Sequence, residues 1–263
     1  MSVDALFRPE GGTVFVPGPA AAGPWDPSIV HGAAVNALFA GRLAHDELTL
    51  ARVTIDFLAP VPMAPLTLSC TEPAGGRRIQ RREASLVADG REVATARAVL
   101  MRRSDLDLPA EVVDHTSPFD PDEAPPLDKA HEAAAKAVGH DSFDSLTLVW
   151  KNIRVEGDRR VHAWVSLARP VVEGVELQAV EIAAVAADYG QSGISRRLPF
   201  AEWSFRNGEQ TIHLARPPVG GWVGIRSDSV VHAVGSGFNT ADLFDAEGLF
   251  GRSSAAVVLE RRR

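Results

Sequence analysis

Cysteine is nearly absent from the sequence, with Cys70 as the single example among 263 residues. One cysteine forms no intrachain disulfide and no cysteine-based metal cluster, and such usage suits a reducing compartment, so we expect a cytoplasmic protein. No apolar run approaches the roughly 20 residues that a membrane-spanning helix needs. The N-terminal stretch, MSVDALFRPEGG, lacks the basic and apolar regions of a signal peptide.

Positive charge is also scarce, with 27 Lys and Arg residues against 34 Asp and Glu residues. The formal net charge of −7 argues against broad binding to nucleic acid or to an anionic membrane. The eight histidines show no metal-ligand pairing at helical spacing, and we predict no metal. The remaining composition, 45% hydrophobic and 23% charged, is typical of a soluble globular protein with one large domain or two ordinary ones.

The chain contains an internal repeat. The segment IDFLAPVPMAPLTL begins at Ile55, and the similar segment IHLARPPVGGWVGI begins 157 residues later at Ile212. Further along, LVADGREVATARAVLMRR and LFDAEGLFGRSSAAVVLERR keep the same order, with their turn glycines at Gly90 and Gly248. Two copies with preserved order indicate a duplicated unit rather than a solenoid, whose periods are shorter.

Each copy has the same predicted elements. An Ala-rich segment of helical composition comes first, over 31–45 in one copy and 175–190 in the other. Strands follow, and an Asp-Gly or Glu-Gly pair between alternating runs marks a tight hairpin in each copy. The predicted strands cover 12–16, 49–58, 66–71, 146–155, 160–168, 210–214 and 222–227. A helix laid against antiparallel strands is an α+β arrangement.

The stretch between the two copies differs in composition from both. It is acidic, Pro-rich and without periodicity from 104 to 140, so we predict a surface linker there. The sequence therefore divides into an N-terminal unit over 1–103, the linker, and a C-terminal unit over 141–263.

Several motifs, taken in their order, resemble the acyl-CoA thioesterase II family. They are VHG at 30–32, DFLAPVP at 56–62, AD at 187–188, RPPVGGW at 216–222 and GRS at 251–253. The resemblance covers nearly the whole chain apart from the linker. It implies a double hot-dog, in which each of two long helices is wrapped in a curved antiparallel sheet. It also implies hydrolysis of an acyl-CoA, or a related acyl thioester, to the free acid and CoA, with coenzyme A present only as part of the substrate.

The resemblance further implies the residues of a site. The family's aspartate at the end of the second helix matches Asp188, and its small polar residue near the next strand matches Asn207. In such a set a carboxylate orients and deprotonates a water, while the neighbouring amide fixes that water. The family's glutamine on the last strand falls at or beside Ala255, where this sequence has a methyl group. Gln191 in the loop and Ser253 on the same strand face are the replacements that the sequence offers.

Two further groups of residues are candidates for substrate binding. His31, Gly32 and Ala33 open the first predicted helix, where backbone N–H groups can polarise a carbonyl, although His31 also fits a helix cap or a core position. Arg77 and Arg81 share one face of a predicted strand and suit the phosphates of coenzyme A. A solvated Arg-rich strand is the commoner explanation of that run.

Other interpretations stay open at this point. Asp188 also fits an exposed helix end, and the Asn-Gly pair at 207–208 is an ordinary turn signal. The alanines at 255 and 256 favour an acyl-CoA or acyl-carrier-protein binding protein with little turnover. Asp26, five residues before His31, partly matches hot-dog hydratases and dehydratases, but the rest of their motif is missing. Long sheet edges favour association into a homodimer.

Overall fold

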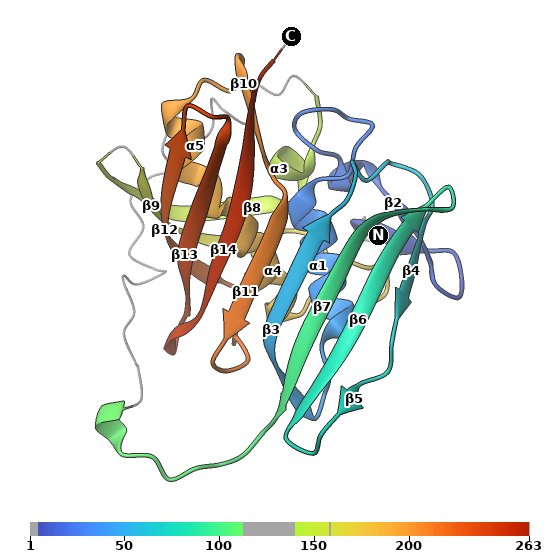
Figure 1. The fold of residues 1–263 in the computed structure, drawn as a ribbon, viewed down its shortest axis with the longest axis vertical. Coiled ribbons are helices and arrows are strands. Elements are labelled where there is room, and N and C mark those ends of the chain that lie inside the picture. Colours follow the sequence, from blue (N-terminus) through green and yellow to red (C-terminus); the bar gives the residue numbers. More distant parts are fainter. Residues whose placement is uncertain (1–4, 113–139, 158, 263) are drawn as a thin grey trace.

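The computed structural model describes residues 5–112, 140–157 and 159–262. In this part of the chain, fourteen strands form one sheet, and every pair of neighbouring strands is antiparallel. Two long helices, α1 and α4, lie behind the sheet in the view of Figure 1. One long helix and one set of antiparallel strands in each half of the chain confirm the predicted α+β class.

The elements fall into two successive sets. The first set consists of β1 (Phe7–Pro9), β2 (Val14–Pro17), η1 (Pro19–Ala21), α1 (Gly32–Leu43), β3 (Leu48–Phe57), β4 (Leu66–Cys70), β5 (Ala74–Gly75), β6 (Ile79–Ala88), β7 (Arg91–Arg102) and η2 (Ala110–Val112). The second set consists of α3 (Phe143–Leu146), β8 (Leu148–Glu156), β9 (Arg160–Leu167), α4 (Ala179–Asp188), η3 (Tyr189–Gln191), α5 (Ser192–Arg197), β10 (Trp203–Asn207), β11 (Glu209–Leu214), β12 (Val223–His232), β13 (Ser236–Asp245) and β14 (Gly248–Arg261).

Strands β3 and β11 join the two halves of the sheet, whose order is β1-β2-β4-β6-β7-β3-β11-β14-β13-β12-β9-β8. Thr54 lies directly opposite Thr211 in this pair, and their hydroxyl groups hydrogen-bond at 3.1 Å. These two residues are separated by 157 positions, which is the offset of the sequence repeat. Equivalent strands of the two copies therefore pair with each other, and the duplication forms one continuous sheet.

The two central helices pack against each other in opposite directions. Gly32, at the start of α1, lies next to Asp188 at the end of α4, and Gly41, near the end of α1, lies next to Glu181 near the start of α4. Both helices are rich in alanine, and nearly all their residues are buried. Small side chains let the helices approach closely while the sheet covers their remaining faces.

Most of the predicted elements are present, with shifted boundaries. Asp89 and Gly90 have φ values of 49° and 75°, which confirms the tight two-residue hairpin that the Asp-Gly pair predicts. The second helix begins at Ala179 rather than at 175, because Gln178 is an extended N-cap whose capping box uses Glu181. Neither α5 nor β10 as a separate strand was predicted from the sequence.

The buried carboxylate of Glu181 has a measurable consequence for stability. Burial raises its pKa from 4.5 to about 7, while its hydrogen bond from the Gln178 N–H acts in the opposite direction. Because the folded state binds the proton more tightly, stability should fall as pH rises between about 4.5 and 7. Glu181→Gln should remove this fall and stabilise the protein at pH 8 by on the order of 2 kcal/mol, measured by urea unfolding across this pH range. An unchanged pH dependence in the variant would contradict this assignment.

The predicted linker, 104–140, lies mainly outside the described residues. Its described beginning is an exposed segment that contains η2. In the described ranges, no helix is both long and apolar enough to cross a bilayer.

Candidate active site

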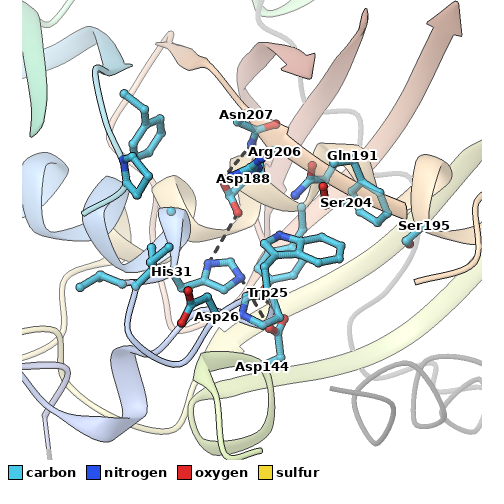
Figure 2. Close-up of a pocket in the computed structure, with 18 of the residues that line it drawn as sticks. Trp25, Asp26, His31, Asp144, Asp188, Gln191, Ser195, Ser204, Arg206 and Asn207 are labelled. Carbon is cyan, nitrogen blue, oxygen red and sulfur yellow. Dashed lines mark hydrogen bonds and ion pairs between the residues drawn. The ribbon is translucent and has the colours of Figure 1, made fainter. Parts of the chain in front are cut away.

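Asp188 closes α4 and is almost completely buried, with 3% of its surface exposed. The side-chain amide of Asn207 donates a hydrogen bond to Oδ1 of Asp188 at 2.9 Å, and the amide of Asn36 donates to the same oxygen at 3.4 Å. Nδ1 of His31 lies 3.8 Å from the other oxygen, Oδ2. Residues from both halves of the chain therefore surround one carboxylate, as Figure 2 shows for Asn207 and His31.

The start of α1 explains why an acidic residue is stable at the end of α4. The C-terminal end of a helix carries partial negative charge, which disfavours a carboxylate there. A Cβ placed on Gly32 would lie 3.4 Å from Oδ1 of Asp188, so the first turn of α1 adjoins the carboxylate. The positive, N-terminal end of α1 thus offsets the negative end of α4.

The surroundings of Asp188 also set its acidity. Burial raises the pKa of Asp188 above its ordinary value, whereas the hydrogen bond from Asn207 lowers it. The negative charge of Asp144 adds to the increase. A carboxylate with a raised pKa is a better proton acceptor near neutral pH.

His31 links this carboxylate to a second one. Its Nδ1 accepts a hydrogen bond from the Ala33 N–H at 2.9 Å, which makes His31 the N-cap of α1. Nδ1 therefore carries no proton, and a neutral ring has its proton on Nε2, which lies 3.5 Å from Oδ2 of Asp144. The other oxygen of Asp144 accepts a hydrogen bond from the hydroxyl of Tyr189 at 2.6 Å. One carboxylate on α3 thus hydrogen-bonds the residue that follows Asp188 and lies close to the cap of α1.

These groups border a cavity of about 1320 Å³ between the two halves of the chain. Among the described strands, β10 pairs only with β14, and most of its residues line the cavity. Most of the wall is apolar, formed by Trp25, Ile29, Val30, Phe57, Leu58, Val61, Leu148, Val149, Trp150, Phe200, Phe205 and Val258. A large apolar cavity with a few convergent polar groups is typical of a small-molecule site.

Five of the predicted site residues line this cavity: His31, Gly32, Asp188, Gln191 and Asn207. Oε1 of Gln191 is buried and has no hydrogen-bond partner in the described part of the chain. The N–H of Gly32 also has no acceptor there, as expected at the first position of a helix. Ala33 differs from the expectation, because its N–H already donates to His31 and is not available to a substrate.

The other predicted residues lie away from the cavity. Ser253 is buried on β14 between Ile212 and Ala241, and it does not line the cavity. Arg77 and Arg81 lie where β6 begins, at the end of the sheet away from β10 (Figure 1). Arg77 borders a separate pocket formed by Gly76, Arg77, Arg78, Ile79 and Arg102.

Ala255, at the position where the family has a glutamine, is buried near two amide side chains. Asn239 lies opposite Ala255 on β13, and Nε2 of Gln210 donates to the Ser254 carbonyl at 3.1 Å. Neither amide lines the cavity. Gln191, by contrast, lines the cavity.

The acid predicted for a hydratase has a local role instead. Oδ1 of Asp26 accepts hydrogen bonds from both the N–H and the hydroxyl of Ser28, at 2.8 and 2.7 Å. These bonds hold the pKa of Asp26 below its ordinary value. Asp26 borders the cavity, but the carboxylates near His31 are those of Asp144 and Asp188.

Sequence reasoning missed three residues of the site. They are Asn36, Asp144 and Tyr189. Asn36 is the one amide within the apolar stretch of α1, and Tyr189 is the single tyrosine of the chain, directly after Asp188. Both signals were present in the sequence, whereas nothing near Asp144 distinguished it from the acidic stretch that precedes it.

Two family models match the sequence. The model of the acyl-CoA thioesterase N-terminal domain matches residues 21–101, and that of the C-terminal domain matches residues 109–259. The chain belongs to the acyl-CoA thioesterase family. No curated protein matches the sequence.

Solved structures show the same fold as this thioesterase family member. A candidate thioesterase II from Thermobifida fusca YX has a TM-score of 0.73 at 16% identity, with 97% of this chain and 95% of that chain covered. The acyl-CoA thioesterase II from Mycobacterium marinum has a TM-score of 0.62 at 12% identity, with the same two coverages. A hot-dog protein from Alicyclobacillus acidocaldarius has a TM-score of 0.66 at 15% identity and covers 96% of this chain and 95% of its own. These likenesses confirm the double hot-dog fold, and the family models support acyl thioester hydrolysis as the general reaction.

Proposed function

We propose that the protein hydrolyses an acyl-CoA thioester and that Asp188 activates the attacking water. The observation that carries this proposal is the 2.9 Å hydrogen bond between Asn207 and Asp188 at the wall of the cavity. Asn207 uses its amide N–H on Asp188, and its carbonyl oxygen has no partner in the described part of the chain. A water that donates to Oδ2 of Asp188 and to Oδ1 of Asn207 would have both protons fixed and a lone pair free for attack.

The proposed reaction needs only water and side chains of this chain. Asp188 takes a proton as the water oxygen bonds to the thioester carbon, which gives a tetrahedral intermediate. The Gly32 N–H at the start of α1 donates to the developing oxyanion. The C–S bond then breaks, and the proton held by Asp188 passes to the leaving sulfur. The products are the free acid and CoA, and Asp188 returns to its starting state.

Gln191 supplies the amide that the last strand lacks in this proposal. Its side chain lies on the cavity wall near Asp188 and Asn207 (Figure 2). Its unpaired Oε1 is an unsatisfied acceptor, which is unfavourable until a donor is bound. A small rotation of the amide would turn this oxygen toward a water or toward an N–H of the substrate.

Release of free thiol from a panel of acyl-CoA substrates, short to long, tests the proposal. We expect steady turnover with at least one chain length that the apolar wall accommodates. Binding of acyl-CoA without turnover would identify an acyl-CoA binding protein instead. Loss of a β-hydroxyl group without release of thiol would indicate a dehydratase.

The pH dependence of the reaction provides a separate prediction. Because the charge of Asp144 raises the pKa of Asp188, Asp144→Asn should lower that pKa and move the acid limb of kcat/KM to lower pH. Asn207→Ala removes a hydrogen bond that lowers the same pKa, so it should move the limb to higher pH. Shifts of both variants in the same direction would show that Asp188 is not the titrating base.

A further inference from the structure

The cavity borders the end of β3 on one side and β10 on the other. β3 ends with a hydrogen bond from the Phe57 N–H to the Gly208 carbonyl at 3.1 Å, and the chain then leaves the sheet. The next residue, Leu58, is 52% exposed and lines the cavity. On the other side, residues of β10, which pairs only with β14 among the described strands, line the same cavity. The exposed Leu58 indicates that the cavity is open to solvent on this side.

Two arginines lie along this side of the cavity, and they differ in their partners. Arg206 on β10 forms an ion pair with Glu260. Arg262, just after β14, is exposed and has no carboxylate within ion-pair distance in the described part of the chain. Its Nη1 donates to the Phe200 carbonyl at 3.1 Å, which leaves most of its five N–H donors unused. Arg262 thus carries an uncompensated positive charge at the cavity.

An aromatic platform holds Arg262 in place. Its guanidinium lies 5.7 Å from the ring centre of Trp25, and its backbone N–H donates to the Glu202 carbonyl at 2.7 Å. Trp25 itself stacks on Phe200, with 3.9 Å between the ring centres, and packs edge-on against Phe205, with 5.0 Å between the ring centres. A guanidinium fixed over an aromatic ring loses little freedom when it binds an anion, and its planar fork suits phosphate oxygens.

Three polar side chains line the same cavity as Arg262. Gln191, Ser195 and Ser204 all line the cavity and lie on one side of Asp188 in Figure 2. Ser195 and Ser204 are on α5 and β10, the elements that precede and follow Phe200. The apolar residues Ile29, Val30 and Val61 come from the first half of the chain. The polar side suits the amide-containing arm of a carrier, and the apolar side suits an acyl chain.

We propose that Arg262, supported by Trp25 and Phe200, binds the phosphate of the 4′-phosphopantetheine arm that carries the acyl group. This inference rests on the proposed function, because it assumes a thioester carbonyl at Asp188. The same phosphate chemistry occurs in coenzyme A and in an acyl carrier protein. The predicted phosphate contacts, Arg77 and Arg81, are thereby replaced by an arginine at the cavity itself.

The test compares substrates with and without the phosphate. Arg262→Ala should raise KM for an acyl-CoA by about tenfold with little change in kcat, since one charge-assisted hydrogen bond is lost. For the matching acyl-N-acetylcysteamine thioester, which lacks the phosphate, KM should not change. Arg261→Ala is the matched control, because Arg261 has the same charge, pairs with Glu202 and does not line the cavity. An acyl carrier protein substrate, run in parallel, shows which carrier the phosphate site serves.

The possible outcomes separate this inference from the proposed function. A selective rise in KM for either phosphate-bearing substrate supports the phosphate site. Equal effects of Arg262→Ala on phosphate-bearing and phosphate-free substrates, or no effect on either, would overturn it. If the wild type hydrolyses none of these thioesters, the proposed function fails, and calorimetry of CoA binding then decides the phosphate site. In that case, unchanged affinity of Arg262→Ala for CoA overturns the inference, and weakened affinity relative to Arg261→Ala supports it.

Discussion

Asp188→Asn should reduce the rate of thioester hydrolysis by about 10²- to 10⁴-fold, the usual contribution of a general base. The asparagine keeps the size of the side chain and an oxygen for the amide hydrogen bonds of Asn207 and Asn36. It cannot take a proton from water, so the chemical step is lost while the cavity stays intact. The measurement is free-thiol release under saturating acyl-CoA, together with the affinity for CoA, which should not change.

The control for this variant is Ser253→Ala. Ser253 is buried close to the predicted glutamine position but outside the cavity, so its loss should leave turnover near the wild-type value. The melting temperature of Asp188→Asn should not fall, because the variant removes a carboxylate whose pKa is already raised by burial. Hydrolysis that survives in Asp188→Asn at the wild-type rate would remove Asp188 from the mechanism.

Asp245→Ala should destabilise the protein by about 3–5 kcal/mol, the range for breaking a buried ion pair. Asp245 is fully buried, and its two oxygens accept hydrogen bonds from Nη1 and Nη2 of Arg216, each at 2.6 Å. The N–H groups of Val219 and Glu247 add two further bonds at 2.9 Å. Without the carboxylate, both N–H groups lose their acceptor. Arg216 then keeps longer contacts with two backbone carbonyls and with Glu247, so the main link between the loops that follow β11 and β13 is lost. Urea unfolding at neutral pH measures the loss.

The same carboxylate predicts how stability depends on pH. Burial would raise the pKa of Asp245, yet Arg216 and the two backbone N–H groups hold it below its ordinary value of 3.8. Its contribution is therefore complete above about pH 4 and disappears as pH falls through the lower pKa of the folded state. Asp242→Ala on the same strand is the control, because Asp242 makes ion pairs with the exposed residues Arg226 and Arg252. That variant should lose only about 1 kcal/mol, and an equal loss in both variants would contradict the argument.

The sequence predicted the fold well because the repeat and the hairpin glycines are local signals. Val53 pairs with Ile212, and Thr54 with Thr211, as two equivalent strands of the copies would. The location of Asp188 at the site also follows the family motif. The domain boundaries, a homodimer and a cytoplasmic location stay predictions.

The sequence could not show which side chains meet at the site. Asp144 and His31 are 113 positions apart, and nothing local brings α3 to the cap of α1. Arg77 and Arg81 were candidates on residue type and strand alternation, which cannot show that they lie outside the cavity that Asp188 borders. Contacts between distant segments depend on how the sheet wraps the helices, and a single sequence does not contain that geometry in readable form.

The antiparallel helix pair has a carboxylate near each of its ends, and the two ends are not equivalent. Asp188 at one end lines the cavity. Glu181 at the other end accepts a hydrogen bond from the Gln178 N–H and packs against Gly41. Of these two positions, which the duplication makes similar, the one beside Gly41 is therefore occupied by the Glu181 side chain. Active-site titration with a tight-binding, nonhydrolysable acyl-CoA analogue should accordingly give a stoichiometry of one equivalent per chain.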